Sequence, residues 1–391
     1  MQTRISTTLA HQLRDRFRER QAQLVSLTRA LVEAESPSGD PHGSRAVVDL
    51  LAKAAETARC VNSIDCIAVP GLGQHLVVRA FQDRAAAGNI LLVGHTDTVH
   101  PRGSIADRPW RVEGNRSYGP GVFDMKANCA LAVALLHVCD DFEVVPSCGV
   151  ILALTCDEEI GSASGWPLLR NIAEAEKVRN ALILEPSAPG GRVKTGRKGT
   201  GIFEMKVEGR AAHAGLEPEK GASAILELAK QTERLHALNN SGSGISVNVG
   251  VVHGGTRSNV VAAEATAQID ARFSTAAEAR VVEDALLNAK PFDERVRVRV
   301  TGGINRPPLE RTPAVIELYE LARNIAGLLD YDLGETQVGG ASDGNFLAEL
   351  GIPVLDGLGI DGDGAHAPHE HIIIDDMPLR GALLAGLIAT L

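Results

Sequence analysis

Short apolar runs in the first half of this chain have the composition of buried strands, and each ends in a polar or charged cluster. These runs cover residues 89–94, 149–156 and 181–184. Helical spacing of apolar residues falls before and between them, at residues 8–33, 44–58, 125–138 and 166–175. Strands that alternate with helices are typical of an α/β domain with a mostly parallel sheet.

The hydrophobic pattern changes after residue 195. Residues 201–209 alternate between polar and apolar side chains, as in a strand with one exposed face. A helix, two strands, a helix and a strand are then predicted at residues 221–238, 246–252, 265–273, 276–289 and 295–301. This order predicts an α+β, ferredoxin-like sandwich with an antiparallel sheet. Buried helices and strands return at residues 314–328, 343–350 and 352–358, and a closing helix starts at Met377.

The predicted organisation is therefore a larger domain interrupted by a smaller one. With 391 residues, the chain is longer than one typical hydrophobic core requires. We expect residues 1–195 and 309–391 to form the larger α/β domain and residues 196–308 to form the inserted domain. The larger domain must then be completed from both sides of the insertion.

Composition excludes some classes of partner. Aromatic residues make up 3% of the chain and the formal net charge is -10, so a nucleic-acid surface is not expected. No run reaches the roughly 20 apolar residues of a membrane span. The N-terminal stretch lacks the apolar core of a signal peptide, and the six cysteines form no CxxC pair. A reducing, cytoplasmic location is the expectation.

The clusters at the strand ends contain the donors that hard divalent cations prefer, carboxylate oxygen and imidazole nitrogen. Ligands bind at the carboxyl ends of parallel strands, where these clusters fall. Two cations about 3.5 Å apart need a bridging carboxylate. We assign Asp124 as the bridge. His95 and Glu185 complete one metal site, and Glu159 and His366 complete the other.

Two further acidic residues have predicted roles beside the metals. Glu158, next to Glu159, is the expected general base, which takes a proton from water and passes it to the leaving amine. Asp97 lies two residues after His95, where it can accept the second imidazole N–H and fix the tautomer. Each motif alone is weak, since acidic clusters are usually solvated. His369 and His371 could also compete with His366 as the ligand.

Together these motifs resemble the zinc-dependent metallopeptidase family that includes carboxypeptidase G, acetylornithine deacetylase and succinyl-diaminopimelate desuccinylase. The resemblance covers nearly the whole chain. It rests on GHTDTV at 94–99, GPGV at 119–122 before Asp124, DEE at 157–159, Glu185-Pro186, and the four-residue spacing from His366 to Glu370. It implies two Zn(II) ions per subunit, with cobalt or manganese as alternatives, and a cis peptide bond before Met125.

The resemblance also implies roles for the inserted domain, which in this family serves as a dimerisation and lid domain. A homodimer is therefore expected. His213 resembles the family's lid histidine, which reaches the opposite subunit's site and stabilises the oxyanion. Asn259 belongs to a GGxxxN-like segment whose Asn points at the site, and Gly340 to a turn that lines the pocket.

The expected substrate is an N-acyl amino acid or short peptide with a free α-carboxylate. Arginine binds a carboxylate best, through two parallel hydrogen bonds. Arg306 is the first choice and Arg272 the second. The predicted reaction is hydrolysis of an amide bond to release a C-terminal amino acid, with glutamate favoured. The alternative is a deacylase of N-acetyl or N-succinyl amino acids. A non-enzymatic binding protein of this fold is disfavoured, because no expected ligand or base is missing.

Overall fold

The computed structural model describes residues 5–142, 144, 146–239 and 242–391. It divides into two compact units. The first comprises Met1–Thr195, Arg311–Gln337 and Ser342–Leu391, apart from the undescribed positions, and the second comprises Gly196–Glu310 and Val338–Ala341. The second unit therefore runs two residues beyond position 308 and includes a short later segment.

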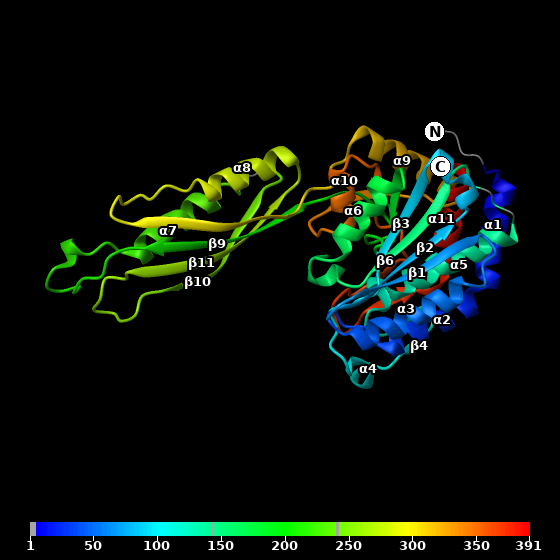
Figure 1. Cartoon of the computed structure of the whole chain (residues 1–391), viewed down its shortest axis with the longest axis horizontal. Coiled ribbons are helices and arrows are strands. Elements are labelled where there is room, and N and C mark those ends of the chain that lie inside the picture. Colours follow the sequence, from blue (N-terminus) through cyan, green and yellow to red (C-terminus); the bar gives the residue numbers. More distant parts are fainter. Residues whose placement is uncertain (1–4, 143, 145, 240–241) are drawn as a thin grey trace. The chain divides into compact units, whose positions relative to one another are not determined.

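The first unit is built on a six-stranded sheet (Figure 1). Its order is β1 (Val61–Val69), β2 (Gly73–Ala80), β6 (Gly149–Thr155), β3 (Asn89–His95), β7 (Val178–Ile183) and β14 (Val354–Leu355). Strands β6, β3, β7 and β14 run parallel, whereas β1 and β2 are antiparallel additions. Every residue of β3 and β6 is buried, which explains their continuous apolar sequences.

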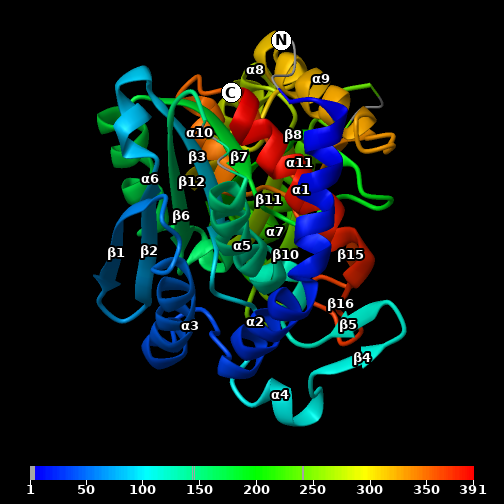
Figure 2. The same cartoon turned by 90° about the vertical axis from the view of Figure 1, so that its right-hand side faces the viewer.

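Helices pack against this sheet in two groups. The larger group, in which α1 and α11 lie side by side (Figure 2), comprises α1 (Thr7–Glu19), α2 (Gln21–Ala34), α3 (Pro41–Ala55), α5 (Ala127–Asp141), α9 (Pro313–Gly327) and α11 (Met377–Thr390). The smaller group is α6 (Gly165–Ala175) with α10 (Asp343–Glu349). A short helix, α4 (Ser104–Asp107), lies in a loop. This confirms the α/β class with a mostly parallel central sheet.

Several local predictions were wrong. The single helix expected over residues 8–33 is two helices that meet at Arg20, whose guanidinium, like that of Arg16, donates to Asp141. Strands β1 and β2 were not predicted. Two small sheets were also missed, one of β15 (Gly362–Asp363), β16 (His371–Ile373), β5 (Arg116–Tyr118) and β4 (Arg111–Glu113), the other of β13 (Glu335–Val338) with β8 (Val193–Arg197).

One helical segment, Val122–Asp141, is long and apolar enough to pass for a membrane span, contrary to the sequence expectation. Its most apolar window is 83% buried inside the protein. Apart from its first turn, this segment is α5, which packs against α2, α3 and α11. A helix that is apolar on all sides is expected at such a position in a large core.

The second unit has the predicted βαββαβ order and confirms the α+β insertion. Its antiparallel sheet has the order β10 (Ser246–Gly254), β11 (Glu264–Phe273), β9 (Gly199–Glu208) and β12 (Arg297–Arg306). Helices α7 (Ala224–His236) and α8 (Ala276–Leu287) cover one face. Phe203, Met205 and Val207 of β9 point into that core, and Ile202 on the opposite face is 62% exposed.

Candidate metal centre and active site

The predicted site residues of the first unit lie where its parallel strands end. His95 is the last residue of β3, Glu158 and Glu159 follow β6, and Glu185 follows β7 by two residues. Asp124 lies at a kink in the turn η2 (Val122–Lys126) that precedes α5, where Asp124 and Met125 have non-helical backbone angles. Since β6, β3 and β7 are parallel neighbours, their carboxyl ends meet at one edge of the sheet.

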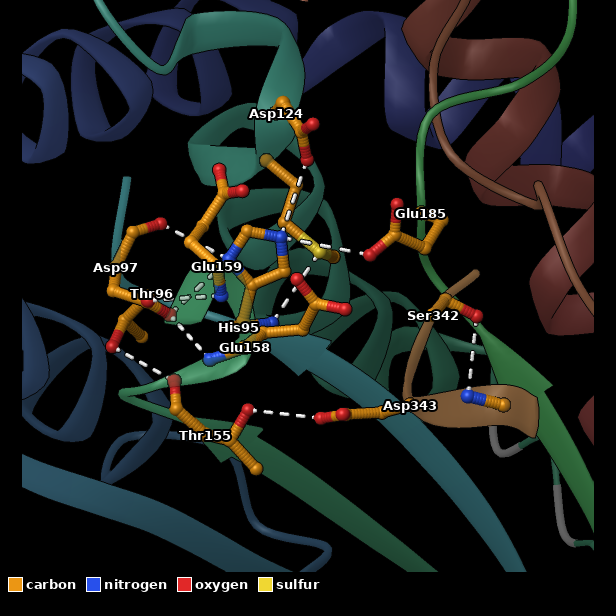
Figure 3. Close-up of polar contacts among 12 residues, drawn as sticks. His95, Thr96, Asp97, Asp124, Thr155, Glu158, Glu159, Glu185, Ser342 and Asp343 are labelled. Atoms are coloured by element: carbon orange, nitrogen blue, oxygen red, sulfur yellow. Dashed lines mark hydrogen bonds and ion pairs between the residues drawn. The ribbon is translucent and has the colours of Figure 1, made fainter. Parts of the chain in front are cut away.

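The first group of potential ligands contains His95, Asp124 and Glu185. The His95 Nε2 atom is 3.2 Å from Asp124 Oδ1 and 3.5 Å from Glu185 Oε1 (Figure 3). His95 is 1% exposed, so its ring is held within the protein and has little freedom to turn away. One nitrogen and two carboxylate oxygens therefore converge on one point.

The second group contains Asp124, Glu159 and His366. The His366 Nε2 atom is 3.3 Å from Asp124 Oδ2 and 3.2 Å from Glu159 Oε2. Asp124 thus turns one oxygen toward each group. Of the two alternative histidines, His371 packs against Tyr118 with the rings tilted and their centroids 5.1 Å apart, and among the described residues neither it nor His369 belongs to a ligand group. The structure brings together the five side chains that the sequence assigned to two metals.

The charges of the site favour the binding of cations. Burial alone would raise the pKa of Asp124, but hydrogen bonds from His366 and His95 outweigh it and lower the pKa. For Glu159, burial dominates and raises the pKa. The pKa of His366 is raised to about 10, first by its hydrogen bond to Asp124 and then by Glu159. Burial lowers the pKa of His95, but Asp124 and Asp97 raise it well above its ordinary value. The carboxylates around these imidazoles thus stabilise positive charge, which is what a cation site requires.

The donor set fits two divalent cations. Three carboxylates and two imidazoles form two groups that share one carboxylate, as binuclear sites require. Glu159 Oε1 is also buried, with no hydrogen-bond partner among the described residues. An unpaired buried carboxylate oxygen is costly unless a ligand completes it.

The role of Asp97 differs in detail from the prediction. The closest acceptor to His95 Nδ1 is the backbone carbonyl of Asp97 at 3.0 Å, while the carboxylate Oδ1 is 3.4 Å away. The carboxylate also accepts the backbone N–H groups of Glu158 and Glu159, at 3.2 Å each, and the Ser38 hydroxyl at 2.6 Å. Asp97 therefore orients both the imidazole and the turn that carries the two glutamates.

Glu158, the predicted general base, lies on that turn, the 3-10 segment η3 (Glu158–Ile160), and is half-buried. Figure 3 shows its carboxylate pointing toward the centre of the site, on the same turn as Glu159. Two adjacent glutamates on an irregular turn can direct one carboxylate to the metals and the other to a water molecule. The peptide bond between Asp124 and Met125 is cis, as the resemblance implied.

Sequence reasoning missed the role of Glu370. This residue is 2% exposed, and its carboxylate accepts the backbone N–H groups of Gly121 at 2.8 Å, Phe123 at 2.9 Å and Asp124 at 3.0 Å. It therefore holds the turn that carries the shared aspartate. The only signal in the sequence was its four-residue spacing from His366.

The remaining predicted residues all belong to the second unit. His213 is exposed, and its Nδ1 accepts the Gly215 N–H at 3.2 Å. Asn259 is also exposed and lies beside it, since the Asn259 carbonyl accepts the Ala214 N–H at 3.0 Å.

The predicted carboxylate-binding arginines differ in their surroundings. Arg272 forms two hydrogen bonds with Asp270, at 2.9 and 3.0 Å, so its guanidinium already has a carboxylate partner. Arg306, at the end of β12, is 6% exposed. The Gly340 carbonyl accepts a hydrogen bond of 3.2 Å from Arg197. The hydrogen bonds to Asp270 weaken the prediction for Arg272.

Known proteins are similar to this chain over most of its length. A family model described as peptidase family M20/M25/M40 matches residues 91–390. Carboxypeptidase G2 of a Pseudomonas species is 28% identical over 385 residues, which cover 95% of this chain and 90% of that protein. Succinyl-diaminopimelate desuccinylase of Thioalkalivibrio sulfidiphilus is 28% identical over 332 residues, covering 79% and 85%.

Solved structures share the fold over nearly the whole chain. Aminopeptidase PepT of Bacillus cereus superposes with a TM-score of 0.78 at 22% identity, covering 94% of this chain and 98% of that one. The Bacillus subtilis YXEP protein, described as a dinuclear metal-binding peptidase of the M20 family, has a TM-score of 0.69 at 15% identity, covering 95% and 98%.

Proposed function

Because this chain belongs to peptidase family M20/M25/M40 and is a hydrolase of that family, we propose that it removes a C-terminal amino acid, preferentially glutamate, from N-acyl or short peptide substrates. The observation that carries the proposal is the pair of ligand groups that share Asp124, with Glu158 on the turn beside them. Two zinc ions are the proposed metals, since carboxylate and imidazole donors suit zinc.

When bound, the metal ions polarise the carbonyl of the scissile amide and lower the pKa of water. The protein's own residues then handle the protons. Glu158 takes a proton from water and delivers it to the departing nitrogen, so one carboxylate acts first as base and then as acid. Asp97 orients the Glu158 turn and the His95 ring, because its carboxylate accepts the Glu158 N–H and its backbone carbonyl lies 3.0 Å from His95 Nδ1.

The second unit supplies the proposed substrate contacts. His213 is proposed to donate to the developing oxyanion, from the partner subunit of a homodimer. Its exposure leaves the ring available for such a contact. Arg306 is proposed to bind the α-carboxylate, and Gly340 is proposed to line the pocket beside it. Asn259 lies next to His213 and is proposed to reach the site together with it. Arg272 is retained only as a secondary contact, because Asp270 competes for its guanidinium.

The glutamate preference rests on the similarity to carboxypeptidase G2. The equal identity to succinyl-diaminopimelate desuccinylase supports a second candidate, hydrolysis of N-succinyl or N-acetyl amino acids. Both reactions use the same metals and base and differ in which part of the substrate is recognised. A cytoplasmic location is also proposed, in keeping with six cysteines that form no disulfide.

The test is a substrate screen with the zinc-loaded full-length protein, scored by the amino acid released. N-acyl-glutamates are compared with the matching N-acyl-alanines, N-succinyl-diaminopimelate and N-acetyl-ornithine. The proposal predicts the highest kcat/KM for the N-acyl-glutamates. A preference for either of the last two substrates would establish the deacylase alternative. Absence of hydrolysis of all four by protein that holds two zinc ions would refute both.

A further inference from the structure

His100 lies in the loop after β3 and is hydrogen-bonded to Glu370, the residue that holds the turn carrying Asp124. It lies five residues after His95 and is 7% exposed. Its Nε2 atom is 2.6 Å from Glu370 Oε2, and its Nδ1 atom is 3.2 Å from Arg108 Nη2. Nothing in the sequence indicates a role for His100, because its partner is 270 positions away.

The two contacts of His100 fix its proton. The guanidinium of Arg108 can only donate, so His100 Nδ1 must accept. The ring proton therefore resides on Nε2, which donates to Glu370. With His100 and three backbone N–H groups as donors, the Glu370 carboxylate accepts four hydrogen bonds. Two carboxylate oxygens offer about four acceptor positions, so this carboxylate is fully satisfied and its orientation is set.

The position of Glu370 matters for the geometry of both ligand groups. Its carboxylate binds the backbone of the η2 turn at Phe123 and Asp124, while its own backbone follows His366 by four residues. His100 adds the segment that begins at His95. The hydrogen bonds of Glu370 thus join the three chain segments that carry His95, Asp124 and His366.

We propose that His100 is a positioning residue for the metal centre. It donates from Nε2 to Glu370, is held in that tautomer by Arg108, and thereby keeps Asp124 oriented so that its two oxygens face the two ligand groups. The inference depends on the metal dependence in the proposed function, but not on the identity of the substrate. Residues hydrogen-bonded directly to metal ligands typically change metal affinity by roughly 10–100-fold when they are removed, and because His100 acts through Glu370 we expect a loss at the lower end of that range, roughly 10-fold.

The test measures zinc affinity of the metal-free full-length protein by competition with a chelator, together with the melting temperature of the metal-free protein. His100→Phe is expected to weaken zinc binding roughly 10-fold and to lower kcat more than it changes KM. His100→Gln should recover most of the affinity, because its amide can accept from Arg108 and donate to Glu370. His42→Phe, the same change at an exposed histidine of the first unit, should bind zinc as the wild type does.

A lower melting temperature with unchanged zinc affinity in His100→Phe would overturn the proposal, since it would show a purely structural role. If His100→Phe does not fold, Arg108→Met decides the matter, because it leaves the imidazole in place and removes the donor that fixes its tautomer. A reduced zinc affinity in Arg108→Met supports the proposal, and wild-type affinity overturns it. Failure of the substrate proposal is distinguishable, because it would appear as tight zinc binding by the wild type without glutamate release.

Discussion

The arrangement around Asp97 makes Asp97→Asn a sensitive perturbation, because both carboxylate oxygens act as acceptors. Oδ1 accepts from Glu158 N at 3.2 Å and lies 3.4 Å from His95 Nδ1, while Oδ2 accepts from Ser38 Oγ at 2.6 Å and from Glu159 N at 3.2 Å. Asparagine has the same shape but replaces one oxygen with an NH2 donor. In either orientation, one backbone N–H of the η3 turn then faces another donor.

The expected loss of stability is that of the less unfavourable of the two orientations of the asparagine amide. With its NH2 toward Ser38, whose hydroxyl can turn to accept, the variant leaves only the Glu159 N–H unpaired. A buried unpaired donor costs about 1–3 kcal/mol, and the remaining bonds lose the strength that the charge gave them. We therefore expect the free energy of unfolding to fall by about 2–4 kcal/mol. The control Ser38→Ala removes a single donor and leaves no donor facing another, so it should cost less, about 1.5 kcal/mol.

Urea unfolding monitored by tryptophan fluorescence is a suitable assay, because both tryptophans, Trp110 and Trp166, lie in the first unit. Burial raises the pKa of Asp97, but its contacts with His95 outweigh burial and lower it. A carboxyl with a lowered folded-state pKa stabilises the protein above the unfolded-state pKa of about 4, and this stabilisation is lost as the pH falls through the folded-state value. The difference between wild type and Asp97→Asn should therefore shrink in acid. A difference that is negligible at pH 7, or that does not change with pH, would refute this reasoning.

Three further predictions follow from the site and the core. Glu158→Gln should keep the wild-type zinc content by metal analysis and lose roughly 10²–10⁴-fold in kcat; a near wild-type rate would contradict its role as base. Zinc binding at pH 7 should release protons, because His366, with a pKa of about 10, must become neutral to ligate; calorimetric heats that do not depend on the buffer's ionisation enthalpy would argue against this. Arg380→Met removes the buried cationic partner of Asp376, 3.0 Å away, and should destabilise the first unit by about 3–5 kcal/mol in urea unfolding. Arg170→Met, at an exposed ion pair, should lower the free energy of unfolding much less than Arg380→Met does, and equal losses in the two variants would contradict the effect of burial.

The parts of the fold that the sequence predicted well are those in which local pattern and burial agree. Strands β3 and β6 are buried throughout, so their apolar runs are continuous and end where the chain leaves the sheet. Alternation in β9 reflects one face on the core and one exposed. Polar residues at such strand ends stand out, which is why His95, Glu159 and Glu185 could be assigned from sequence.

The elements that were missed lack such a pattern. Strand β1 is at the edge of the sheet, and its nine residues are all partly or fully exposed, with no regular alternation. Its strand conformation depends on pairing with β2 over the whole length of both. The break between α1 and α2 is similar, since it coincides with ion pairs from Arg16 and Arg20 to Asp141, more than 100 positions away. Contacts of this kind leave no local periodicity.

The same distinction separates the metal ligands from the residues that support them. A ligand must offer a specific donor at the end of an element, so its residue type and place carry information. Glu370 and His100 act instead through backbone N–H groups and through each other, across separations of 246 to 270 positions. Any residue except proline can supply a backbone N–H, so nothing in residues 121–124 indicates that a buried carboxylate will bind there. The geometry of the centre therefore depends on residues that become recognisable only once the chain is folded.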